Sequence, residues 1–137
     1  MTTANTYIAS AATIAGSSKA GLTTFTVRAS GTKANLRSDG EIYHRQNPIV
    51  EVVETLDCEC RDRSSIPAIG AIGQCVFAGV KPIGTDQSGA SITCTAAKAV
   101  VESVESTLDN SGQPVVRITL AVNGASGTAS GIVWASA

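Results

Sequence analysis

The chain has 137 residues, 43% of them hydrophobic and 4% aromatic, and its formal net charge is −1. This length suffices for one domain with a hydrophobic core and without disulfide staples. The near-neutral charge argues against a protein that binds nucleic acid through its phosphates. Charged residues make up 15% of the chain, against about 25% in typical soluble domains. This low charge favours a surface that is buried against copies of the chain, and a monomer with an uncharged polar surface is the alternative.

Alternating apolar and polar residues predict β-strands along most of the chain, because successive side chains of a strand point to opposite faces. In chain order, strands are expected at 7–14, 22–30, 49–62, 74–80, 91–95, 100–108 and 115–122, with an edge strand at 132–134. The strand at 49–62 has the clearest pattern. Its apolar face consists of Val50, Val52, Leu56, Cys58 and Cys60, and Glu54 is the one charge on that face.

Two segments are compatible with either helix or strand, namely residues 64–74 and 96–106. In the first, Ser64 and Ser65 are possible helix caps, but two glycines weaken a helix. In the second, the turn formers at 109–114 favour a strand at 100–108 that forms a hairpin with 115–122.

Residues 31–48 form a long polar segment without an apolar face, which is unusual inside a compact domain. We expect an extended arm that contacts a neighbouring copy. The predicted fold is therefore all-β, or β-rich α+β, as a two-sheet β-sandwich or half-barrel with at most one or two short helices. The chain is expected to be one domain over 1–137, with the arm at about 31–48 and a small-residue C-terminal segment at 124–137.

The four cysteines, Cys58, Cys60, Cys75 and Cys94, are the first residues to consider as a metal site. Structural zinc ligands are commonly spaced C-x₂₋₄-C, whereas the close pair here is at i and i+2 on an alternating strand. Both thiols of that pair then lie on the apolar face, and buried cysteine packs as a small hydrophobe. We predict core packing and no metal. No signal peptide or membrane-length apolar run is visible, so a reducing cytosol is expected during synthesis.

No residues assemble into a recognisable catalytic site. His44 is the only histidine, and a general base needs a positioned partner that the sequence does not show. The carboxylates Asp57 and Glu59, or Glu102 and Glu105, could form an acid/base pair, but strand positions favour solvated or interface charges. We therefore expect neither enzymatic activity nor a cofactor.

The charges are distributed unevenly along the chain. Residues 19–45 carry five basic and two acidic side chains, and residues 51–62 carry five acidic side chains against one arginine. A basic arm of one copy could meet the acidic strand of another in a head-to-tail assembly. The alternative is that the basic and the acidic segments are two separate faces exposed to solvent.

Three stretches of the chain occur in an order that is seen in a known family. Residues Asp39-Gly40-Glu41-Ile42-Tyr43 lead into the acidic strand at 49–61, a Gly/Thr-rich middle leads into 89–93, and a late hairpin joins 99–106 to 115–120. Over roughly residues 37–122 this layout resembles that of the tail tube (major tail) proteins of tailed bacteriophages and related injection machines.

The resemblance implies two packed sheets, hexameric rings that stack, and sheets that continue between subunits around a lumen for genome passage. It also implies that a long loop and the termini hold the next ring, so the arm and the segment at 124–137 are the candidate contacts. The candidate interface residues are Lys33, Arg37, Asp39, Glu41, Tyr43, His44, Arg45 and Trp134.

The leading hypothesis is a non-enzymatic virion protein that assembles with itself and with other virion proteins in the host cytoplasm and ends in the tail. Double-stranded DNA would be a passing cargo and not a specific ligand, and no membrane binding is expected. The alternatives are another virion component (a tail terminator, connector, capsid decoration or coat protein) and a monomeric β-sandwich binding module or adhesin.

Overall fold

The structure is a computed structural model of the chain. It describes residues 5–19, 21–34, 36, 40, 42–43, 46–61, 66–108, 110, 112 and 114–136. All statements below refer to these residues.

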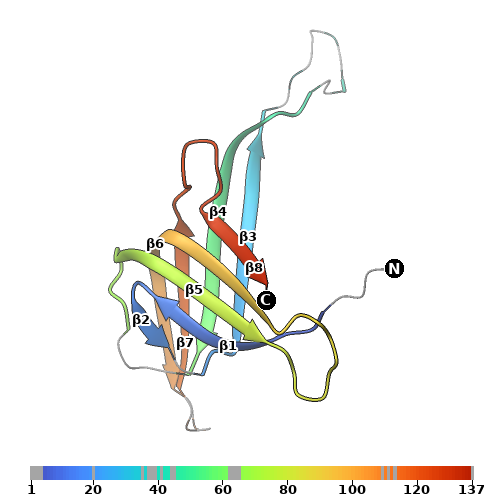
Figure 1. The fold of residues 1–137 in the computed structure, drawn as a ribbon. Coiled ribbons are helices and arrows are strands. Elements are labelled where there is room, and N and C mark those ends of the chain that lie inside the picture. Colours follow the sequence, from blue (N-terminus) through green and yellow to red (C-terminus); the bar gives the residue numbers. More distant parts are fainter. Residues whose placement is uncertain are drawn as a thin grey trace.

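The described part of the chain consists of eight β-strands and contains no helix (Figure 1). The strands are β1 (Ile8–Ile14), β2 (Ser17–Lys19), β3 (Thr24–Lys33), β4 (Ile49–Cys60), β5 (Ile72–Val80), β6 (Ser91–Leu108), β7 (Pro114–Val122) and β8 (Ile132–Ser136). The predicted all-β class is confirmed.

All eight strands are hydrogen-bonded into one antiparallel sheet, in which seven follow the order β2-β1-β5-β6-β7-β4-β3 and β8 pairs with β6 outside this order. The long strand β6 organises this sheet. One of its edges pairs with β5, and the other edge is shared by β8, which pairs with Ile92–Ala96, and β7, which pairs with 99–108. Because β3 stands last in the order, it has a strand neighbour on one side only within the described residues.

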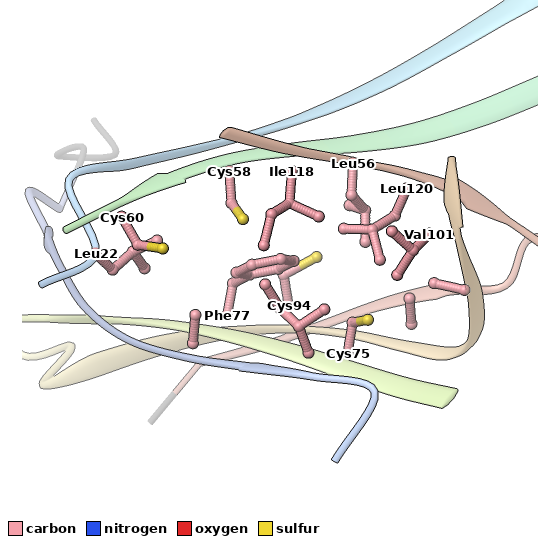
Figure 2. Close-up of a cluster of buried hydrophobic side chains, with 14 of the residues drawn as sticks. Leu22, Leu56, Cys58, Cys60, Cys75, Phe77, Cys94, Val101, Ile118 and Leu120 are labelled. Carbon is pink, nitrogen blue, oxygen red and sulfur yellow. The ribbon is translucent and has the colours of Figure 1, made fainter. Parts of the chain in front are cut away.

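The core lies between strands from the two ends of this order (Figure 2). Leu56, Cys58, Ile118 and Leu120 from β4 and β7 face Phe77 and its neighbours from β5, β1 and β6. The ring of Phe25 in β3 stacks on that of Phe77, with ring centroids 5.3 Å apart. Because the core holds few aromatic rings, the strands that face each other must approach closely to fill it. The small side chains of the core, mainly Val, Cys and Ala, allow this close packing.

The structure differs from the sequence-based expectations at two places. Ser17–Lys19, where no strand was expected, form the short strand β2, because Ala15 and Gly16 take positive φ angles and return the chain antiparallel to β1. Residues 91–108 are one strand and not two. Ala99 at its middle pairs with Gly73 on one side and Val122 on the other, and this two-sided pairing outweighs the helix propensity of the alanines.

The two ambiguous segments are strand or loop where they are described. Residues 96–106 belong to β6, residues 66–71 form a loop that is joined to β6 by the Gly70 N–H···O Val101 bond, and residues 72–74 begin β5. Residues 64 and 65 lie outside the described part.

Candidate assembly surface

The β3–β4 hairpin extends beyond the body of the protein as a two-stranded arm (Figure 1). Strand β7 pairs with β4 only over Thr55–Cys60, so the first half of β4 is hydrogen-bonded to β3 alone. Beyond the strands, the Ala34 N–H donates to the Pro48 carbonyl at 2.9 Å, and Leu36 and Gln46 bond each other in both directions. The polar segment at 31–48 is therefore the distal part of a hairpin at these positions.

The proximal part of the arm exposes branched apolar side chains on both faces. Val50 and Val52 are 66% and 62% exposed on the face that carries the buried Leu56, and Ile49 and Val53 are exposed on the opposite face. The sequence pattern predicted that Val50 and Val52 belong to a half-buried strand, which is wrong. The alternation is present, but the described residues leave these two side chains largely exposed before Leu56. Exposed apolar clusters of this kind mark interaction surfaces.

Three of the eight predicted interface residues are described. Lys33 ends β3 and pairs with Ile49 in register, and Tyr43 is 81% exposed beside the equally exposed Ile42. Trp134 lies in β8 on the body, where its ring is 6.2 Å from that of Phe25. The structure thus does not bring Trp134 together with Lys33. Arg37, Asp39, Glu41, His44 and Arg45 lie outside the described residues.

Sequence reasoning missed Ile42, Ile49 and Val53 as interface candidates. A signal was present, because the doublets Ile49-Val50 and Val52-Val53 place apolar side chains on both faces of one strand. A strand that is apolar on both faces requires two covering layers, and the described residues leave the side chains of both doublets exposed.

The acidic residues at the second half of β4 have partners in their own chain. Asp57 accepts a hydrogen bond from the Thr119 hydroxyl at 2.8 Å and lies 3.5 Å from Arg28, and Glu59 lies 3.5 Å from Arg117. Two of the five acids that the head-to-tail charge hypothesis assigned to another copy are therefore neutralised locally. Arg28, which pairs with Asp57, is one of the basic residues that the same hypothesis assigned to the contact with another copy.

Glu54, the charge on the apolar face of β4, holds the loop between β7 and β8. Its carboxylate accepts hydrogen bonds from the Ser130 hydroxyl at 2.6 Å and from the Gly131 N–H at 3.3 Å. The loop and the first half of β4 enclose a groove of about 660 Å³. Its walls are Ile49, Val50, Glu51, Val52, Glu54, Val122, Gly124 and residues 126–130.

Replacing Glu54 by alanine should release this loop. We expect Glu54→Ala to lower the free energy of unfolding by about 1 kcal/mol, since two hydrogen bonds at a partly exposed carboxylate are lost. Glu51→Ala, three residues away and exposed, is the control and should change it by less than about 0.5 kcal/mol. Urea unfolding measures both values, and equal effects would show that the Glu54 contacts do not hold the loop.

The four cysteines are free thiols inside the core (Figure 2). Burial raises the pKa of the Cys58 thiol to about 12, with a further contribution from Cys60, and raises that of Cys94 to about 11. Burial also raises the pKa of Cys75. The predicted packing of the cysteines in the core is confirmed. Among the described residues, no three His, Cys, Asp or Glu side chains are grouped so that they could hold a metal ion.

The thiols should therefore react slowly in the folded protein. The thiolate is the reactive form. The raised pKa values of Cys58 and Cys94 keep their thiolates scarce at pH 8, and burial keeps the reagent away from the sulfur atoms. We expect a thiol reagent to label less than one cysteine per chain in the time in which it labels all four in 6 M guanidinium. Fast native labelling of several cysteines would contradict the packing of the core.

No protein-family model matches the chain, and no curated protein is significantly similar to it. The described residues include no helix that is long and apolar enough to cross a membrane.

Proposed function

We propose that this protein is a non-enzymatic structural subunit that polymerises, and that it forms the tail tube of a bacteriophage as stacked rings around a channel for DNA. The observation that carries this proposal is the two-stranded arm, which exposes Ile49, Val50, Val52 and Val53 outside the body. A monomer that stays in solution covers or charges such a surface.

Two further features support the same proposal. Strand β3 has ten residues and one strand neighbour, and its exposed edge is available to a strand of a second copy. The polar side chains on the outer face of β3, β4 and β7 pair with each other in Arg28–Asp57 and Arg117–Glu59. Locally paired charges suit a wall along which DNA passes without being held.

Negative-stain electron microscopy of the untagged protein over a concentration series tests the proposal. Hollow tubes or rings of constant diameter are expected, and analytical ultracentrifugation should show a critical concentration. A monomer at all concentrations, with or without a preassembled tail initiator, would exclude the proposal and favour a binding module. Closed oligomers that never stack would indicate a terminator, connector or decoration protein.

A further inference from the structure

The loop between β5 and β6, residues 81–90, is a hydrogen-bonded turn that presents one isoleucine to solvent. The Ile83 side chain is fully exposed at the tip, and Gly84 follows it with φ +90°. Gly84 occupies the third position of a four-residue turn that begins at Pro82, where a positive φ is required in a type II turn. The Thr85 hydroxyl donates to the Pro82 carbonyl at 3.1 Å and closes this turn.

The side chain of Gln87 fastens this loop to the N-terminal segment. Its amide oxygen accepts the Thr6 N–H at 2.9 Å, and its amide nitrogen donates to the carbonyls of Thr6 at 2.9 Å and Gly89 at 2.8 Å. At the base of the loop, the Lys81 N–H donates to the Ala90 carbonyl at 2.8 Å. These bonds restrict the loop before any partner arrives, which lowers the entropy lost on binding.

The 81–90 loop lies toward one end of the molecule, and the β7–β8 loop and the first half of β4, which line the groove, lie toward the other end (Figure 1). Contacts between unlike surfaces at opposite ends of identical subunits repeat from copy to copy and build open stacks. The groove offers exposed apolar walls at Ile49, Val50 and Val52, and the loop offers the Ile83 side chain, which the described residues leave fully exposed.

The charges of the two surfaces complement each other. Glu51 and Glu54 line the groove and Lys33 lies beside it on the arm, whereas the loop carries Lys81 and Asp86. Lys81 can therefore face the glutamates while Asp86 faces Lys33. Complementary charges of this kind select the register of a contact and suppress wrong pairings.

We propose that the 81–90 loop of one copy docks in the groove between β4 and the β7–β8 loop of the next copy, with Ile83 against Val50 and Val52. This inference rests on the proposed self-assembly and names one of the contacts between successive copies. The Glu54 contacts with Ser130 and Gly131 then have a function, because they keep open the side of the groove that receives the loop.

Cysteine crosslinking tests this contact. Ile83→Cys and Val52→Cys are made as separate variants and as a double variant, and the native thiols do not interfere because all four are buried. After mild oxidation, the mixed single variants should give one crosslinked dimer band, and the double variant should give a ladder. Ile69→Cys with Val52→Cys is the matched control, since Ile69 is also exposed but lies in another loop, and it should not crosslink.

The outcomes separate this contact from the proposed function. Tubes in the microscope without an Ile83→Cys/Val52→Cys crosslink would overturn the docking and leave self-assembly intact. A dimer of Ile83→Cys with itself would also overturn it, because that product requires a symmetric contact. If the unmodified chain never assembles and no crosslink forms, both proposals fail.

Substitution provides a second, non-covalent readout. Ile83→Asp should raise the critical concentration about tenfold or more, because a buried isoleucine is replaced by a charge that faces two glutamates. Ile69→Asp should leave it within about twofold. Lys81→Glu should weaken assembly, and adding Glu51→Lys in a double variant should restore it. A double variant that assembles no better than Lys81→Glu alone would rule out this register.

Discussion

Deletion of residues 32–46 should abolish polymerisation and leave a folded protein. The deletion removes the distal part of the arm, including the exposed Ile42 and Tyr43, and joins Gly31 to Asn47. Burial of each such side chain against a neighbour contributes about 1.5–3 kcal/mol, so assembly should be absent up to about a hundredfold higher concentration. Electron microscopy and sedimentation of the variant beside the unmodified chain measure this effect.

The fold should survive this deletion because none of its described residues belongs to the hydrophobic core. Thermal unfolding should shift by no more than the few degrees that correspond to about 1 kcal/mol in a domain of this size. Trp134 reports on the core independently, because its ring lies near that of Phe25. Ile42→Ser with Tyr43→Ser is a milder variant that tests the same contact. Normal tubes from either variant would exclude the distal part of the arm from assembly.

Phe77→Ala should cause the largest loss of stability of any single substitution considered for this chain. Phe77 is completely buried and its ring stacks on that of Phe25. The described core holds no other fully buried aromatic side chain, and the contact with Phe25 joins β5 to β3, the last strand of the order. Truncation of a buried phenylalanine costs about 3–5 kcal/mol, which is a large share of the stability of a small domain.

Denaturant unfolding monitored by the fluorescence of Trp134 measures this loss. Leu108→Ala is the control, since Leu108 is 63% exposed at the end of β6 and should cost less than about 0.5 kcal/mol. Ile118→Val removes one buried methyl group, and its loss of stability should lie between those of the other two variants, at about 0.5–1.5 kcal/mol. A loss below 1 kcal/mol for Phe77→Ala would contradict the packing of β3 on β5.

Local sequence pattern was a good guide to the strands and a poor guide to their burial. The alternation in β4 and β7 placed both strands within two residues, because the period of two is a property of each strand by itself. The exposure of Val50 and Val52 could not be read from that pattern. It depends on where β7 stops pairing with β4, at Thr55, and β7 lies about 60 residues further along the chain.

The candidate surface was predicted only in part for the same reason. The long polar segment after β3 pointed to an arm, and Lys33 and Tyr43 lie on it. Trp134, also assigned to the interface, lies on the body near Phe25 and is half exposed, so its assignment stays a prediction. The partners of Glu54 are 76 and 77 residues away in sequence, and no spacing rule links them.

The sequence by itself determined the all-β class, the positions of most strands and the burial of the four cysteines, because these follow from side-chain alternation and from the hydrophobicity of a thiol. Only the tertiary structure decided which apolar side chains have a covering layer, which charges are paired, and that the arm and the Ile83 loop lie toward opposite ends. These properties arise from contacts between strands that are distant in the chain. Such contacts form only when the sheet closes around its core.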